Sequence, residues 1–337
     1  MSIKGINEFK GGHSMKYVIT ALIAILIVLI LMIVSLKLGS IDISFGELIK
    51  GLLSGSNEGN MGIIKDLRMP RVIIAALVGG NLALAGVLLQ AVIRNPLADP
   101  QVTGISSGAC LVSLIFIIFM PASGLIRPIV GFFGGLVSCI VVYLMAYKKE
   151  LDTMRIVLAG AAINALLGGL SQILTIGSGI GAGNIQSWIS GSLAATSWDE
   201  VKILFLYSII GMGFALILAK SCNVIVLGNK NAKSLGFNSD LQMILITVVA
   251  VFLGSVSTAI VGIISFVGLV VPHICRILIG SDHRYLIPFS IFVGGALVLL
   301  ADTIGRMLVK PYEIPAGIIM AVIGAPFFLY LLRRSDM

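Results

Sequence analysis

Long apolar segments alternate with shorter polar ones along almost the whole chain. Each apolar segment holds about 18–25 residues, the length that an α-helix needs to cross the hydrocarbon core of a bilayer. The pattern predicts ten membrane-spanning helices. Their expected bounds are 17–36, 69–93, 103–120, 128–147, 154–176, 201–219, 241–259, 262–279, 285–306 and 314–332.

Three of the polar connections are longer than simple turns. Residues 37–67 predict an external loop, and residues 220–240 predict an inner polar region with several lysines. Residues 177–200 contain Trp188 and Trp198 but no lysine or arginine. Because tryptophan concentrates at the membrane–water interface, we expect a short helix here near the outer surface.

The composition fits only one broad class of protein. Hydrophobic residues make up 58% of the 337 residues, charged residues 11%, and the mean hydropathy is +1.09. A soluble domain carries about 25% charged residues. The chain is therefore predicted to be an all-α polytopic membrane protein with a single transmembrane domain over 1–337. A signal peptide is the competing interpretation of the first apolar run, but the run is long and no small-residue cleavage site follows closely.

The net charge of +8 could indicate a nucleic-acid partner. In a membrane protein an excess of lysine and arginine more often marks the cytoplasmic loops. If the N-terminus is inside, the majority of the 23 lysine and arginine residues fall on the inner side. We therefore expect both termini in the cytoplasm, residues 1–16 as a cytoplasmic tail, lipid as the surroundings and no nucleic-acid partner.

The sequence contains little material for catalysis. The nearest approach to a phosphate-binding loop, residues 229–234, has Ala232 where glycine is required before the lysine. The three histidines do not group with serine and acidic residues, and the four cysteines form no CxxC pair. We expect no catalytic residue, no cofactor and no metal site.

Asp302 is the one acidic residue in a long apolar run. An ionisable group inside a membrane helix is a functional candidate, for example in an ion-coupled carrier. Arg306 follows four residues later on the same helical face, so a local ion pair is the simpler interpretation. Both interpretations stay open at this point.

Seven stretches, in order, resemble one family, the FecCD-type permeases of ABC importers for iron–siderophore complexes, haem and vitamin B12. The stretches are RMPR at 68–71, RNPLADP at 94–100, GISSGA at 104–109, GNKNAKSLG at 228–236, GIISFVGLVVPHICRILIGSDHRYLIP at 262–288, ADTIGR at 301–306 and EIPAGIIMAVIGAPFFLYLL at 313–332.

This resemblance implies the type II importer permease fold, with ten transmembrane helices per subunit in a homodimer in the cytoplasmic membrane. Two separate ATPase subunits would dock inside and hydrolyse ATP, and a substrate-binding protein would dock outside. The helices within 69–176 and 241–332 would form an inverted repeat, although no sequence repeat is evident. The implied cargo is an iron complex, with a ferric siderophore favoured over haem or cobalamin.

The resemblance also implies roles for individual residues. The region 220–240 would contain the ATPase-coupling surface, which consists of Gly228, Lys230, Ala232, Lys233, Leu235 and Gly236. Three basic residues would dock the binding protein: Arg68, Arg71 and Arg306. The alternatives are a solvated loop and arginines that extend to the membrane interface.

Other positions are expected to shape turns or the inner gate. Proline fixes the backbone and removes a donor, so we expect structural turns or helix ends at Asn95, Pro96, Pro272 and His273. The resemblance implies an inner gate at the loop before the helix 154–176 and at the start of that helix, where Thr153 is the candidate. The competing functional classes are an ion-coupled secondary carrier and a membrane receptor or structural protein.

Overall fold

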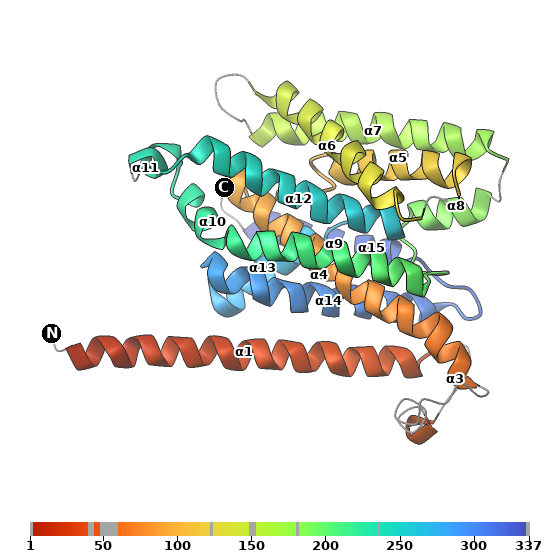
Figure 1. Ribbon diagram of the computed structural model, residues 1–337, viewed down its shortest axis with the longest axis horizontal. Helices are drawn as coiled ribbons and strands as arrows, with labels where there is room; N and C mark the ends of the chain where they lie inside the picture. The colour runs from red at the N-terminus through yellow and green to blue at the C-terminus, as the bar shows by residue number, and fades with distance from the viewer. Residues whose placement is uncertain are drawn as a thin grey trace.

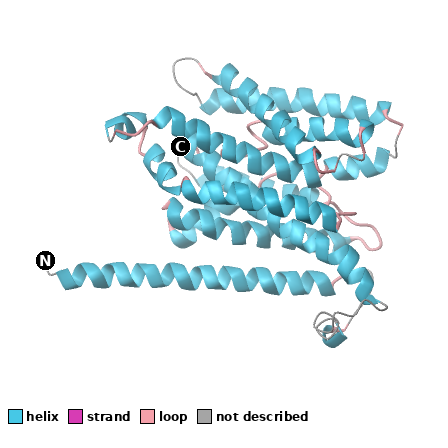
Figure 2. Cartoon of the chain, in the orientation of Figure 1, coloured by secondary structure: helices cyan, strands magenta, loops and turns pink. Residues whose placement is uncertain are grey.

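The computed structural model describes residues 3–39, 44–47, 60–121, 124–147, 153–179, 182–234 and 236–334. Within these ranges the chain consists of helices and loops, and Figure 2 shows no strand in them. The helices are α1 (Ile3–Lys37), α3 (Asn60–Ile63), the π-helix η1 (Ile64–Arg68), α4 (Met69–Ile93), α5 (Ile105–Phe119), α6 (Arg127–Ala146), α7 (Thr153–Gly177), α8 (Ala182–Ile189), α9 (Trp198–Ile217), α10 (Ala219–Val226), α11 (Asn229–Ser234), α12 (Ser239–Val261), α13 (Val267–Ile279), α14 (His283–Leu308) and α15 (Ala316–Arg334).

All ten predicted membrane helices are present in the structure. In the described part of the chain, seven helices are long and apolar enough to span a bilayer. The other three, α5, α13 and α15, are shorter apolar helices. The all-helical, multi-span prediction is therefore confirmed.

Two of the short helices begin later than their apolar pattern predicts. Each follows a residue in the left-handed backbone region, Gly104 (φ +76°) before α5 and Phe266 (φ +68°) before α13. The predicted helix start at 262 is wrong because Gly262 (φ +77°) ends α12 and the N–H of Ile263 then donates to the carbonyl of Ile189 (3.2 Å). A non-helical segment therefore precedes each of these two short helices.

The two ends of the helix bundle carry different elements. Figure 1 shows α10 and α11 at one end, toward which both chain termini lie, and α3 and α8 at the opposite end. The predicted short helix in 177–200 is α8, and Trp188 Nε1 donates to the carbonyl of Ile260 (3.0 Å). The expected tail at 1–16 is helical from Ile3 onward, because α1 begins there.

Helix α4 lies at the centre of the bundle and is buried along most of its length. Glycines let its backbone approach two other helices. A Cβ atom on Gly79 would collide with the carbonyl oxygen of Gly294 on α14, and one on Gly86 would collide with that of Gly268 on α13. Such small residues allow close helix packing where the lipid provides no hydrophobic driving force. The backbones of helices α4 and α14 are consequently in direct contact at Gly79 and Gly294.

The two halves of the chain repeat one order of helices. In each half a long helix is followed by a short one with a left-handed residue at its start: α4 by α5, and α12 by α13. Helix α4 packs on α13 and α14, and α12 packs on α5 and α6. This crossed packing is the arrangement that an inverted repeat would produce.

Candidate functional site

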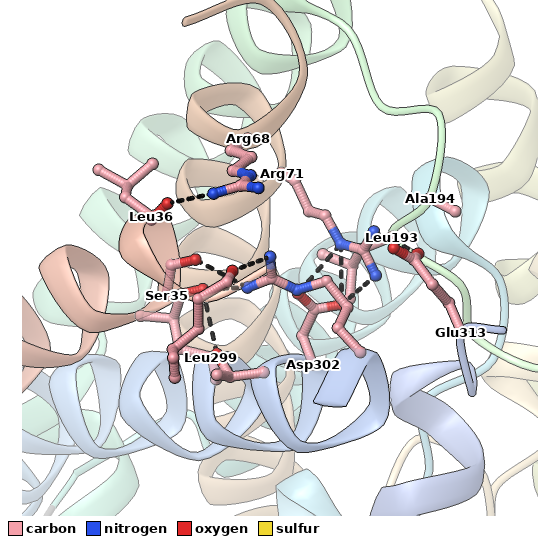
Figure 3. Close-up of polar contacts among 12 residues, drawn as sticks. Ser35, Leu36, Arg68, Arg71, Leu193, Ala194, Leu299, Asp302 and Glu313 are labelled. Carbon is pink, nitrogen blue, oxygen red and sulfur yellow. Dashed lines mark hydrogen bonds and ion pairs between the residues drawn. The ribbon is translucent and has the colours of Figure 1, made fainter. Parts of the chain in front are cut away.

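A cluster of charged side chains lies at the end of the bundle that carries α3 and α8. Figure 3 shows Arg71, from the first turn of α4, pointing toward Asp302 on α14 and Glu313 in the loop before α15. Arg71 Nε lies 3.0 Å from both carboxylate oxygens of Asp302, and Nη2 lies 2.8 Å from one of them. Arg71 Nη1 lies 2.6 Å from Glu313 Oε2. One guanidinium therefore binds two carboxylates.

Arg306 contacts the same aspartate from the other side. Its Nε lies 3.2 Å from Asp302 Oδ2, which confirms the predicted pair four residues apart. The Asp302 side chain is only 1% exposed, so its charge would be very costly to bury alone. Two arginines offset that charge, and Asp302 is not a free acid in the membrane.

Three cations also bind carbonyl groups in the last turn of α1 and in the two residues that follow it. Arg306 Nη2 donates to the carbonyl of Ser35 (3.0 Å), and its Nη1 donates to that of Leu38 (3.0 Å). Arg68 Nη1 donates to the carbonyl of Leu36 (2.9 Å), as Figure 3 shows. Lys310 Nζ donates to the carbonyl of Gly39 (3.2 Å).

The final carbonyls of a helix have no partner within the helix, and the helix dipole places partial negative charge there. Arginine and lysine from η1 and α14 and its following loop supply both the missing hydrogen bonds and the opposite charge. The end of α1 is thereby fixed to the rest of the bundle, although α1 is otherwise largely exposed along its apolar length.

These contacts bear on the expected docking of a binding protein. Arg68 and Arg306 are 7% and 6% exposed and are held by partners within the chain. Only the Arg71–Glu313 edge of the cluster reaches the surface, through Glu313, which is 45% exposed. Docking by Arg68, Arg71 and Arg306 stays a prediction. It would require the two buried arginines to leave their present contacts.

The expected ATPase-coupling surface lies at the opposite end of the bundle. Gly228 (φ +99°) separates α10 from α11, and Gly236 (φ +72°) follows α11, so both allow turns that other residues rarely adopt. Ala232 is fully buried, and its carbonyl accepts a hydrogen bond from the N–H of Phe237 (3.1 Å). In this structure Ala232 is thus a packing residue rather than a surface contact. Leu235 lies outside the described residues, as do the side chains of Lys230 and Lys233.

The turn after α4 has the structural role that its sequence predicts. Asn95 Oδ1 accepts a hydrogen bond from the N–H of Leu97 (2.8 Å), which closes a turn around Pro96. Arg94 ends α4 with a left-handed backbone (φ +52°). Its Nε donates to the carbonyl of Ile225 on α10 (3.0 Å).

Asp99, in the same connection, has a role that its local sequence does not reveal. Its carboxylate is buried and accepts hydrogen bonds from the N–H of Gln101 (2.7 Å) and from the backbone of Gly268, in the first turn of α13. Burial raises the pKa of Asp99 to about 6. The available signal was an acidic residue between two prolines, flanked by apolar helices on both sides.

The remaining predicted positions fall in helices. Pro272 lies inside α13, and the His273 ring packs edge-on against Phe327 at 5.9 Å between centroids. The predicted turn or helix end at Pro272 and His273 is therefore wrong, because α13 continues through both residues to Ile279. Thr153 is the first residue of α7, and its gating role stays a prediction.

Residues 25–334 match the model of the FecCD transport family. The Fe(3+)-citrate import system permease protein YfmD of Bacillus subtilis (strain 168) is 37% identical over 314 residues, which cover 93% of this chain and 94% of the relative. A protein named as the heme-iron transport system permease protein IsdF of Staphylococcus aureus (strain MSSA476) is 38% identical over 303 residues, covering 90% and 92%.

Solved structures agree with the fold. An inward-facing structure of a metal-chelate type ABC transporter superimposes with a TM-score of 0.78 at 29% identity, covering 94% of this chain and 99% of that one. PsaBC from Streptococcus pneumoniae, in complex with Fab, has a TM-score of 0.59 at 20% identity, covering 85% and 95%, which supports the fold alone.

Proposed function

The chain belongs to the FecCD transport family, and on this basis we propose that it is the membrane permease subunit of an ABC importer for an iron complex. The observation that carries the proposal is similarity over nine-tenths or more of the chain to permeases named for ferric citrate and for haem iron. Transport would run inward across the cytoplasmic membrane, with both termini in the cytoplasm.

A ferric siderophore is the favoured cargo, and haem is the alternative within the same mechanism. The relatives named for ferric citrate and for haem iron are 37% and 38% identical, so overall similarity does not choose between the two ligands. Cobalamin is the third candidate from the family resemblance. Selectivity would reside mainly in the binding protein, because a permease must pass a bulky ligand without holding it tightly.

The partners would be a second copy of this chain, two ATPase subunits on the side of α10 and α11, and a binding protein on the side of α8. The exposed surface of α7 is a candidate for the contact between the two copies. Leu158, Leu166 and Ile173 on this helix are each more than half exposed. Gly168 and Gly169 have open space beside them, so another helix could approach closely.

A secondary carrier driven by an ion gradient is the alternative from another class. Such a carrier needs an ionisable group that binds and releases its ion during transport. Asp302 was the sequence candidate, and its carboxylate is bound by Arg71 and Arg306. This arrangement favours a structural role and supports an importer energised by a separate ATPase.

The substrate assignment is tested by uptake into proteoliposomes that contain the permease and its ATPase. Ferric citrate, a second ferric siderophore, haem and cobalamin would each be supplied with a matching binding protein. We expect ATP-dependent accumulation of one iron complex and no accumulation of cobalamin. Accumulation of cobalamin alone would contradict the iron assignment, and accumulation of none would contradict the importer assignment.

A further inference from the structure

Helix α10, which leads into the expected coupling segment at 228–236, is held to α14 by one amide side chain. Asn223 Nδ2 on α10 donates to Asp282 Oδ1 (2.8 Å), just before α14 begins. Asn223 Oδ1 accepts from the backbone N–H of His283 (2.9 Å) and lies 2.7 Å from His283 Nδ1. The turn between α13 and α14 therefore binds both the nitrogen and the oxygen of the Asn223 amide.

The acceptor in this contact is a charged group. Arg284 binds Asp282 through Nε and Nη2, at 3.0 and 2.6 Å from Oδ2, and holds the pKa of Asp282 down at about 2. Asp282 is consequently ionised at neutral pH, and a hydrogen bond to an ionised acceptor is about twice as strong as one between neutral groups. His283 is buried, so the contact lies partly out of water.

A second contact, two residues further along α10, joins this helix to α4. Arg94 Nε donates to the carbonyl of Ile225, in the last turn of α10. A cation at a helix C-terminus is favoured by the helix dipole. The side chains of Cys222, next to Asn223, and of Ile225 are fully buried. Helix α10 is thus tied to the inner ends of both α4 and α14.

The same two helices are joined to one another through the membrane. Gly79 and Gly294 bring their backbones together in the interior. Arg71 and Asp302 join them near the opposite end. Helices α4 and α14 therefore form one body, with α10 bound at one end and the Arg71–Asp302–Glu313 cluster at the other. Packed elements of this kind move as rigid bodies.

We propose that Asn223 is a positioning residue for transport: it fixes the coupling segment to the α4–α14 pair, so that ATPase movement reaches the opposite mouth. This proposal rests on the proposed function, since it needs an ATPase partner at α10 and α11. Asn223 touches neither cargo nor nucleotide in this account and acts through α14.

A charge exchange between Asn223 and Asp282 tests the proposal. Asn223→Asp places a second carboxylate against Asp282 and removes the donor that Asp282 binds, so the contact breaks. Adding Asp282→Asn restores a donor and an acceptor with their positions exchanged, and asparagine still serves at the start of α14. The control is Arg284→Gln, which removes a different partner of Asp282 without touching α10.

The readout is the ratio of binding-protein-stimulated to basal ATPase activity in nanodiscs containing the full complex. For Asn223→Asp we expect this ratio to fall about tenfold toward unity, the effect of losing a charged hydrogen bond. Basal ATPase activity and ATPase binding should persist. The double variant should recover most of the ratio, and Arg284→Gln should keep it.

Hydrogen exchange provides the second readout, and it does not require transport. Residues 219–226 should exchange faster in Asn223→Asp and return to the wild-type rate in the double variant. Failure of the double variant to recover either readout would overturn the proposal, as would an unchanged ratio in Asn223→Asp. If the wild-type complex itself shows no ATPase association, the proposed function fails, whereas the exchange result still reports whether Asn223 holds α10.

Discussion

Arg71 and Asp302 lie 231 positions apart in the sequence, and the guanidinium of Arg71 donates three hydrogen bonds of 2.8–3.0 Å to the carboxylate of Asp302. The pair joins the start of α4 to the last third of α14, and Arg306 binds the same carboxylate. An aspartate that alone would indicate ion binding in the membrane is thus part of a paired structural cluster.

Removing the Asp302 charge should destabilise the permease strongly. Asp302→Asn leaves Arg71 and Arg306 without their common counter-ion, and breaking a buried ion pair costs about 3–5 kcal/mol. We expect a clear fall in the midpoint of thermal unfolding in detergent. Glu313→Gln is the control, because its partly exposed pair with Arg71 contributes under about 1 kcal/mol. Equal midpoints for the two variants would contradict the account of this cluster.

The arginines that bind the end of α1 should hold that helix to the bundle. In Arg68→Gln the carbonyl of Leu36 loses its charged donor, so the last turn of α1 should fray. Hydrogen exchange of residues 34–38 should become faster, with little change in α12. Lys202→Gln serves as the control because Lys202 is exposed and, among the residues that the structure describes, pairs with exposed Asp199. Unchanged exchange in Arg68→Gln would show that the capping contacts are unimportant for α1.

Asp99 should make stability depend on pH. Its pKa in the folded protein, about 6, lies above the ordinary value of 3.8, because burial favours the neutral carboxyl group. A raised carboxyl pKa contributes stability that is fully present below pH 3.8 and is lost as the pH rises through about 6. The shift corresponds to about 3 kcal/mol. Unfolding midpoints measured from pH 4.5 to 7.5 should fall more steeply for the wild type than for Asp99→Asn, and parallel profiles would exclude this role.

Close packing of α4 on α14 should make Gly79 intolerant of even one added methyl group. A Cβ atom there meets the backbone of Gly294, which has no flexible side chain to move aside. Gly79→Ala should therefore destabilise the fold. Gly213→Ala on α9 meets open space and should be neutral or slightly stabilising, since alanine favours a helix by about 1 kcal/mol over glycine. The unfolding midpoint of Gly79→Ala should lie below that of Gly213→Ala. Equal midpoints would contradict the close packing of α4 on α14.

The sequence predicted the ten helices because each apolar run is long enough to be recognised alone, and it predicted Asp302–Arg306 because four residues on a helix share a face. It could not predict Arg71–Asp302, which depends on how α4 packs on α14. The start of α13 was misplaced because the apolar side chains of 262–266 continue the pattern while the backbone leaves the helix at Gly262.

The sequence also does not predict which small or charged residues are buried. Ala232 lies in a polar segment whose sequence predicts exposure, yet its side chain is fully buried. Arg68 resembles a surface base, yet it binds carbonyl groups of α1. In both cases the local pattern gives the polarity of the segment, whereas burial depends on how other helices pack: α10 and α12 around α11, and the end of α1 against Arg68.

We propose that this permease is energised by a partner ATPase and not by an ion gradient. The most direct measurement is uptake of the iron complex into proteoliposomes that contain permease and ATPase, with the binding protein supplied on the side opposite the ATPase. ATP is supplied without any ion gradient in one arm, and proton or sodium gradients are imposed without ATP in the other. We predict uptake only in the ATP arm. Uptake that requires an ion gradient and does not depend on ATP would contradict an ATPase-driven importer. Asp302 would then again be the candidate for ion coupling.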